Sequence, residues 1–489
     1  MHPLDGQIIQ KDHLGWKLSV AYKKLHKKTR NLPIPTGIFP RKFYSFYLTP
    51  TPLGSKQLCL IVSQDQYQGE IMLSWKLHGD GKQIQPGEVV SIDERLSWPR
   101  TLGMGLQHIV AMFGATFLVP IITGFSPTTT LFFSGIGTIL FIIITQNKLP
   151  SYLGSSFAFL APVAAAKTSG GIPAALGGIV AAGVLLAVVG FVAKAAGTAW
   201  IDSLLPPVVT GTIVMVIGLN LAGAAKNDFM QGQRLGLITL LAIGLISAFF
   251  RGFLGRISIF AGLVIGYVVA ALMGDVDFAG VEAASWVAMP SFTSPTFDSS
   301  AMLLFLPVVL VLIAENVGHV KAVAAMTGKN LDDQIGNALI ADGAATTLAG
   351  LGGGSGTTTY AENIGVMAAS RVYSTLAYIF AGVGAILLAL SPKFGAVLSA
   401  TPAGVKGGVT VALFGMIGVL GARIWIDGRV NFANPINLYI AASCLIIGIS
   451  DMSWTRGDYT FSGIINATIL AVFGYQILNR IAKARGTGN

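Results

Sequence analysis

Long apolar runs recur along most of this chain, and they constrain its fold more than any other feature. They begin near Gly103 and continue to about Leu478, and a run of roughly 20 residues is enough to cross a bilayer as a helix. Hydrophobic residues make up 53% of the chain and charged residues only 11%, whereas a soluble domain has about a quarter of its residues charged. We therefore expect an all-α polytopic membrane protein.

The apolar runs divide into about fourteen segments, which is an even number of spans. Their approximate centres are residues 112, 138, 160, 182, 213, 241, 264, 311, 341, 362, 382, 412, 442 and 469. If the N-terminus is cytoplasmic, most Lys and Arg residues fall in the inside loops, as the positive-inside rule requires. The pattern predicts that both termini face the cytoplasm.

The third and tenth segments are short and interrupted by small and polar residues. One opens with residues 150–159 and the other with residues 352–360. They lie seven segments apart, and an odd number of spans per half makes the second half inverted relative to the first. Paired broken segments in inverted halves indicate a transporter site near the membrane midplane. The alternative is that their glycines only allow close helix packing.

Residues 1–100 are polar and lack the apolar core of a signal peptide. They are interpreted as a cytoplasmic tail, disordered or weakly folded. Residues 1–85 show no helical or strand periodicity, which favours a mis-called start with translation beginning at Met72. We expect the transmembrane domain over residues 101–480 and a second cytoplasmic tail over residues 481–489.

Several classes of function are disfavoured by what the sequence lacks. The net charge of +10 is explained by basic loops between spans, so no nucleic-acid partner is expected. The two cysteines form no CxxC or Cys/His cluster, which excludes the usual structural metal sites. No phosphate-binding loop, HExxH or GxSxG motif is present. We therefore expect no enzyme, no catalytic residues, no metal and no cofactor, with a gradient as the source of energy.

Ionisable residues inside apolar runs are costly and are candidates for function. Glu315 and His319 lie four residues apart, on one face of a helix. Glu362 follows the second interrupted run, and His108 and Asp342 lie in two further segments. Polar pairs can also hold membrane helices together, so a structural role stays open for each. A further charge, Lys406, can reach an interface through its long side chain.

These residues suit a neutral planar base such as uracil, which presents ring N–H donors beside carbonyl acceptors. Glu315 and Glu362 would accept from the donors, and main-chain N–H groups near Phe157 and Ala361, where extended chain meets a half-helix, would meet the carbonyls. Phe157 could also stack on the base. A carboxyl removed from water binds a proton more readily, so proton coupling follows.

Five stretches carry a resemblance to a known family: residues 93–96, 106–115, 152–159, 314–319 and 359–368. With them the chain resembles the nucleobase–ascorbate transporter (nucleobase:cation symporter-2) family, and within it the bacterial uracil and pyrimidine permeases, over about residues 93–480. The resemblance implies fourteen spans as two inverted sevens. It also implies a core domain of segments 1–4 and 8–11, a gate domain of segments 5–7 and 12–14, and pairing as a homodimer.

The family signature falls on Glu362, Asn363, Gly365, Ser370 and Arg371. Ser370 replaces the usual threonine. Glutamate at the first position resembles the uracil branch more than the xanthine or urate branch.

The resemblance also implies individual roles. Glu315 and Glu362 would bind the base, and main chain at Phe157 and Ala361 would complete the site. Ala361 stands where uracil permeases have glycine. His319 would assist through solvent or proton linkage. The residues implied to support Glu362 are His108 and Tyr360.

We therefore expect a proton-coupled symporter that imports uracil or a related pyrimidine across a bacterial inner membrane. The alternatives are a carrier of the same fold for a purine such as xanthine or urate, or for a small anion, and a passive channel. An anion carrier would use a positive residue without two nearby carboxylates, so Lys406 keeps that alternative open. Expected partners are the base, protons and the lipid bilayer.

Overall fold

The computed structural model describes residues 47–50, 56–59, 74–251, 255, 257–306, 308–456 and 459–486. The chain divides into two compact units, Met1–Gly69 and Glu70–Asn489. In the first unit, β1 (Tyr47–Pro50) pairs antiparallel with β2 (Lys56–Cys59). The expected start at Met72 lies outside the described residues.

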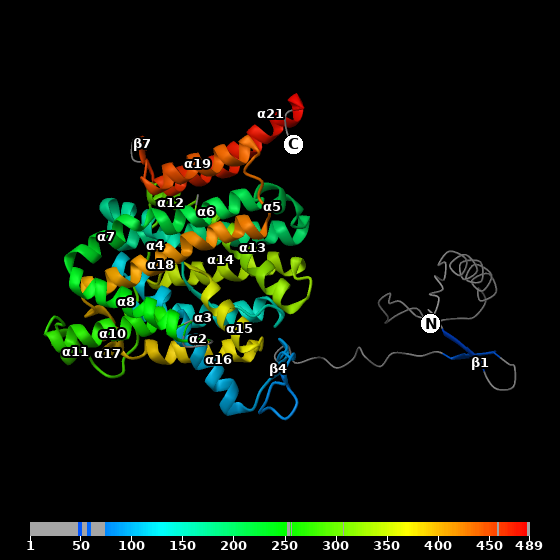
Figure 1. Cartoon of the computed structure of the whole chain (residues 1–489), viewed down its shortest axis with the longest axis horizontal. Coiled ribbons are helices and arrows are strands. Elements are labelled where there is room, and N and C mark those ends of the chain that lie inside the picture. Colours follow the sequence, from blue (N-terminus) through cyan, green and yellow to red (C-terminus); the bar gives the residue numbers. More distant parts are fainter. Residues whose placement is uncertain are drawn as a thin grey trace, which may run out of the picture. The chain divides into compact units, whose positions relative to one another are not determined.

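The second unit is a helical bundle (Figure 1). The helices of its first half are α2 (Trp98–Thr123), α3 (Pro127–Ile144), α4 (Leu160–Ala196), α5 (Ala199–Leu204), α6 (Pro207–Asn220), α7 (Ala222–Gln231), α8 (Gln233–Phe249), α10 (Ser258–Met273) and α11 (Ala279–Ala283). Those of its second half are α12 (Ser299–Phe305), α13 (Val308–Thr327), α14 (Ile335–Gly352), α15 (Ala361–Ser370), α16 (Thr375–Ala389), α17 (Pro392–Ser399), α18 (Ala403–Asp427), α19 (Pro435–Ile449), α20 (Gly463–Ile469) and α21 (Tyr475–Arg485).

Short strands and turns complete the second unit. They are β3 (Lys76–Leu77), β4 (Glu94–Arg95), β5 (Leu153–Ser155), β6 (Thr357–Thr359), β7 (Trp454–Arg456), β8 (Tyr459–Phe461), the 3₁₀ turns η1 (Phe157–Phe159) and η2 (Asp332–Gln334), and the π-turn η3 (Leu470–Gly474). Strands β3 and β4 pair in parallel, and β7 and β8 pair antiparallel.

Seven helical stretches in the described part of the chain are long and apolar enough to cross a membrane, and a bent pair, α16 with α17, raises the number to eight. Three shorter apolar helices, α8, α10 and α19, accompany them. Each of the fourteen predicted centres lies on a helix. The chain is therefore a multi-pass membrane protein, while the arrangement of fourteen spans in two inverted halves stays a prediction.

Local sequence explains where the helices begin and bend. Ser126 accepts a hydrogen bond from Thr129 N, and Pro127 follows it at the first helical position of α3. Within α4, Gly171 adopts φ 70° and ψ −165°, which breaks the helix two residues before Pro173. The third and fourth predicted segments therefore lie on the two sides of one bend.

The bundle is held together by pairs of long helices that come from different halves of the sequence. Helix α4 packs along α14, α6 along α18, and α3 along α16. The first of these pairs flanks the interrupted segments, because β5 and η1 lead into α4 while β6 follows α14 directly.

Candidate functional site

The two interrupted segments meet in the structure. Strands β5 and β6 pair antiparallel, with Leu153 opposite Thr359, Gly154 opposite Thr358 and Ser155 opposite Thr357. All six residues are buried. The pairing supplies hydrogen bonds to the backbone of both broken segments, a requirement that is strict inside a membrane.

Two glycines make room for aromatic rings that pack against the paired strands β5 and β6. A Cβ on Gly154 would lie 2.3 Å from Cζ of Tyr360, and a Cβ on Gly356 would lie 2.3 Å from Cε2 of Phe159. Each ring therefore comes from the segment opposite its glycine. The Tyr360 hydroxyl also donates to the carbonyl of Ser155 at 2.9 Å. The glycines that mark these segments in the sequence are thus needed for their packing.

A helical turn begins directly after each strand. Phe157 is the first residue of η1, and Ala361 is the first residue of α15. The first amides of a helix have no partner within it and can bind an acceptor. At both residues extended chain meets the start of a helical turn, as the sequence predicted, while the role of this main chain in binding stays a prediction. The Phe157 ring meets Phe414 of α18 edge-on, with centroids 5.4 Å apart.

The two predicted carboxylates approach this point from different helices. Glu315 and His319 lie one turn apart on α13, and Glu362 lies in the first turn of α15. Helix α13 packs against both β6 and α15. Glu315 is close enough to Glu362 and Asp342 for their charges to interact.

The site residues keep some solvent access although their neighbours do not. Glu315, Ala361 and Glu362 are half-buried, whereas the adjacent Asn316 and Asn363 are fully buried. The two carboxylates are therefore less enclosed than the asparagines that follow them. The arrangement offers two acidic acceptors beside two helix N-termini.

Asp342 has a different environment, because its carboxylate is completely buried and both oxygens are hydrogen-bonded. Asn316 Nδ2 donates to Oδ2 at 2.8 Å, and Thr357 Oγ1 donates to Oδ1 at 2.8 Å. These bonds join α13, α14 and β6. Asp342 therefore orients the second interrupted segment, which is the structural role that the sequence left open.

His319 connects to the same network. Its Nδ1 lies 2.8 Å from the hydroxyl of Thr359, the last residue of β6. The Thr359 hydroxyl also donates to Asn316 Oδ1 at 3.4 Å. His319 is thus linked through β6 to the residues beneath the site.

His108 and Asn363 form a buried pair between α2 and α15. Asn363 Nδ2 lies 3.1 Å from His108 Nδ1 and donates to the His108 carbonyl at 3.0 Å. The His108 ring packs on Tyr378, with centroids 4.1 Å apart. Among the described residues, His108 Nε2 has no hydrogen-bond partner. The amide therefore fixes the position of α15 against α2.

Tyr360 and His108, the residues implied to support Glu362, are its neighbours in space but bond elsewhere. Thr116 donates to the Tyr360 hydroxyl at 3.2 Å, and that hydroxyl donates to β5 as described above. Within the described ranges neither side chain makes a hydrogen bond to Glu362. Tyr360 instead bonds to β5 and His108 contacts Asn363 of α15, so the implied support of Glu362 by these two residues stays a prediction.

The remaining signature residues end α15. Arg371 adopts φ 58° as its left-handed cap, and its N–H donates to Met367 O at 3.0 Å. Ser370 Oγ accepts from Val372 N at 3.2 Å. Gly365 lies between these residues and Glu362. At a rise of about 1.5 Å per residue, Arg371 is roughly 13 Å from Glu362 along the helix, so the structure does not bring them together.

Lys406 lies in the first turn of α18, which packs against α7. Its charge interacts with that of Asp228 on α7. It is half-buried. Lys406 therefore has an acidic residue of the neighbouring helix within electrostatic range.

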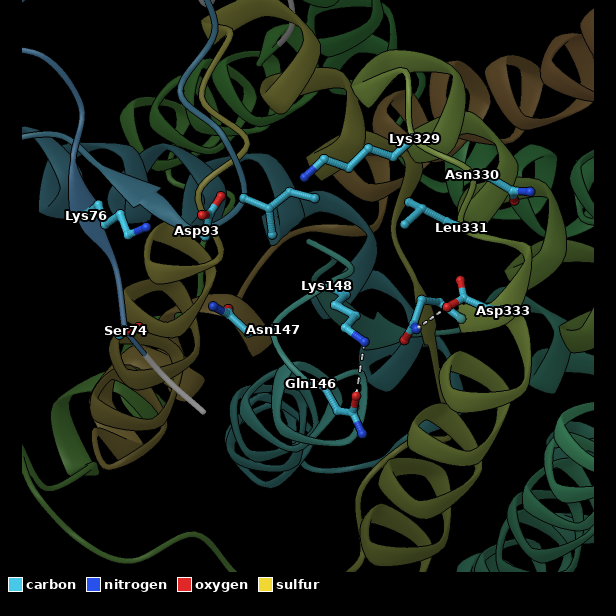
Figure 2. Close-up of a pocket in the computed structure, with 12 residues that line it drawn as sticks. Ser74, Lys76, Asp93, Gln146, Asn147, Lys148, Lys329, Asn330, Leu331 and Asp333 are labelled. Carbon is cyan, nitrogen blue, oxygen red and sulfur yellow. Dashed lines mark hydrogen bonds between the residues drawn. The ribbon is translucent and has the colours of Figure 1, made fainter. Parts of the chain in front are cut away.

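A cavity of about 810 Å³ opens elsewhere, where the loop before β5 and the loop after α13 meet the leader segment, residues 74–97 (Figure 2). Its lining includes Lys76, Lys148 and Lys329 with Asp93 and Asp333, but neither Glu315 nor Glu362. Since Lys148 and Lys329 line one cavity, the two loops that carry them lie near each other, while their placement on the cytoplasmic side stays a prediction.

Sequence reasoning missed the packing of the leader segment. Its residues Val90 and Ile92 are buried, and Val90 forms a bridge with Val372 beyond α15. The signal was a short apolar alternation at the end of a polar region, which is too short to identify a strand.

Comparison with known proteins identifies relatives along most of the chain. The model of the permease family for xanthine and uracil permeases matches residues 99–457. A protein of Escherichia coli (strain K12), provisionally named pyrimidine permease RutG, is 47% identical over 80% of this chain and 92% of its own length. The uracil permease of the same strain is 41% identical over 78% of this chain and 92% of its own length. That of Bacillus caldolyticus is 39% identical over 81% and 95%.

Two solved structures share the fold. The transmembrane domain of the cyanobacterial bicarbonate transporter BicA aligns with a TM-score of 0.55 and 15% identity, over 76% of this chain and 96% of that one. The murine anion transporter Slc26a9 aligns with a TM-score of 0.60 and 10% identity, over 79% and 69%. At these identities the likeness concerns architecture alone. The architecture and the family match together show that this chain is a membrane transporter of the xanthine/uracil permease family.

Proposed function

We propose that this protein is a proton-coupled symporter that imports uracil or a related pyrimidine base. One observation carries the proposal: α13, which carries Glu315, packs against η1 and against α15, whose first turn carries Glu362. The relatives named as uracil permeases support the choice of base.

The site is complementary to a planar ring that carries alternating N–H and C=O groups. Glu315 and Glu362 accept hydrogen bonds from the ring N–H groups, and the main-chain N–H groups at Phe157 and Ala361 donate to the carbonyls. Hydrogen bonds to a charged acceptor are worth about 1.5–3 kcal/mol each. A base that lacks a matching N–H would leave a carboxylate unpaired, which gives selectivity.

Proton coupling follows from the repulsion between the two carboxylates. Two negative charges in a water-poor site oppose each other, and one bound proton removes that repulsion. A site that holds the base and one proton together carries less charge through the membrane than a site with both groups ionised. No cofactor is needed, since the proton gradient supplies the energy.

The proposal includes the arrangement of the protein in its membrane. Fourteen spans form two inverted sevens, with a core of segments 1–4 and 8–11 and a gate of segments 5–7 and 12–14. Residues 1–100 and 481–489 form cytoplasmic tails in a bacterial inner membrane, and two copies pair through the gate. The positive-inside pattern supports this orientation.

The test is uptake of labelled uracil by proteoliposomes with an imposed inward proton gradient. The native protein is compared with Glu315→Gln and Glu362→Gln, each of which keeps the side-chain shape and removes the charge. The matched control is Glu282→Gln, which changes an exposed glutamate on α11. We expect gradient-driven accumulation by the native and control proteins and its loss in both site variants.

Other outcomes separate the alternatives. Uptake of xanthine or of a small anion in place of uracil would overturn the choice of substrate and keep the architecture. Uracil entry that never exceeds the outside concentration would identify a passive channel.

A further inference from the structure

The leader segment is hydrogen-bonded to the chain that directly follows α15, the helix that carries Glu362. Val90 N donates to Arg371 O at 2.9 Å, Tyr373 N donates to Val90 O at 2.8 Å, and Thr375 N donates to Ile92 O at 3.2 Å. The two stretches run parallel at this bridge. The connection between α15 and α16 is therefore held as if it were a strand of a sheet.

The hydroxyl of Thr375 joins three parts of the chain. Trp75 Nε1 donates to it at 2.8 Å, and it donates to the Ile92 carbonyl at 3.1 Å. It is also hydrogen-bonded to the side chain of Asn147. Asn147 belongs to the loop that enters β5, whereas Thr375 begins α16. The leader thus ties the loop that enters the first interrupted segment to the loop that leaves the second.

This tie is one of the contacts that hold α15, which has ten residues and carries Glu362 in its first turn; the bond from Asn363 to His108 of α2 is another. The start of α15 is held by the β5–β6 pair and by Tyr360 N, which donates to Tyr152 O at 3.0 Å. Its other end is held at Arg371 O by the leader. Because α15 has only ten residues, release of its end at Arg371 would let the helix tilt about the contacts of its first turn, where Glu362 lies.

The leader has internal hydrogen bonds that keep its shape. Glu94 accepts from Ser91 N at 2.9 Å and lies 2.8 Å from His78 Nδ1. Partial burial disfavours the charged form of Glu94, but the bonds from Ser91 and His78 outweigh it and hold the pKa of Glu94 below its ordinary value. These bonds lie within the leader and do not involve α16.

We propose that Trp75 and the strand at Val90–Ile92 are positioning elements of the transport site, which fix α15 and with it Glu362. The substrate readout of this proposal rests on the proposed function. Its structural readout does not, because the position of α15 can be followed without any substrate.

The experiment removes the hydrogen bonds of the Trp75 indole and of the Thr375 hydroxyl by single substitutions. Trp75→Phe keeps an aromatic ring and loses the N–H donor, and Thr375→Val keeps the shape and loses the hydroxyl. Thr375→Ser restores the hydroxyl. The matched control is Trp454→Phe on β7, which makes the same chemical change at an exposed position.

Two quantities are measured on the purified full chain. One is the dissociation constant for uracil, and the other is hydrogen–deuterium exchange of peptides covering residues 361–375 and 147–156. We expect Trp75→Phe and Thr375→Val to weaken uracil binding about threefold to tenfold, as the loss of one hydrogen bond predicts. Exchange should rise in these peptides alone, and Thr375→Ser and Trp454→Phe should match the native protein.

Unchanged binding and unchanged exchange in both tie-breaking variants would overturn the proposal. Exchange that rises equally across α18 and α19 would also overturn it, since it would show general loss of stability. If the native protein binds no uracil while exchange still rises locally in the variants, the proposed function fails and the positioning role stands.

Discussion

Replacing Gly343 by alanine tests whether α4 and α14 touch through their backbones. A Cβ at Gly343 would lie 2.4 Å from Ala187 N and 2.6 Å from Gly183 O. Ordinary contact begins at 3.4 Å, so the helices must separate by about 1 Å (3.4 − 2.4) to admit one methyl group. The obstacles are backbone atoms of a packed helix, which cannot rotate away as a side chain can.

The free energy of unfolding should fall by about 2 kcal/mol. Overpacking costs about 1–3 kcal/mol, and the rigid surroundings place Gly343→Ala near the upper value. Alanine returns about 1 kcal/mol through its higher helix propensity. The matched control is Gly415→Ala on α18, where no atom from another element of the described chain lies within 4 Å of the new Cβ. Gly415→Ala should raise the free energy of unfolding by about 1 kcal/mol, because it adds helix propensity without a steric clash.

The assay is thermal unfolding of the purified protein in detergent, followed by the fraction that stays monodisperse after heating. The expected order of stability is Gly415→Ala above native, and native above Gly343→Ala. Uracil binding should weaken in Gly343→Ala alone, because α14 also carries Asp342 beneath β6. A Gly343→Ala protein as stable as Gly415→Ala would refute the backbone contact.

Three further predictions concern hydrogen bonds. Asp342→Asn replaces one acceptor oxygen by an N–H₂ group, which then faces one of the two donors, Asn316 or Thr357. We expect the free energy of unfolding to fall by about 1–3 kcal/mol in thermal unfolding. Lost uptake at full stability would instead indicate a direct role in transport. Asn363→Leu removes the side-chain amide that joins α15 to His108 of α2, so the free energy of unfolding should fall by a similar amount, and a native value would contradict the pairing. For Glu94, whose pKa is lowered on folding, the stabilisation is present above the unfolded value of 4.5 and is lost as pH falls through the folded value. The stability difference between native protein and Glu94→Gln should therefore shrink below about pH 4.5, and a difference that is independent of pH would argue against this account.

The sequence alone predicted the features that depend on local pattern. Apolar runs of bilayer length identified a membrane protein, because no soluble core could bury them. The spacing of Glu315 and His319 placed them on one face of a helix, as the structure has them on α13. Small and polar residues marked the two interrupted segments. Extended motifs identified the family, which the comparisons confirm.

Only the tertiary structure decided which distant residues meet. The pairing of β5 with β6 joins residues some two hundred positions apart, and no local periodicity records such a register. The partners of Asp342 and of the Tyr360 hydroxyl come from other helices and strands, so their orienting roles follow from packing alone. The contact of the leader with the end of α15 was hidden for the same reason. A polar segment reveals a strand only when the groups that it hydrogen-bonds are brought beside it by the rest of the fold.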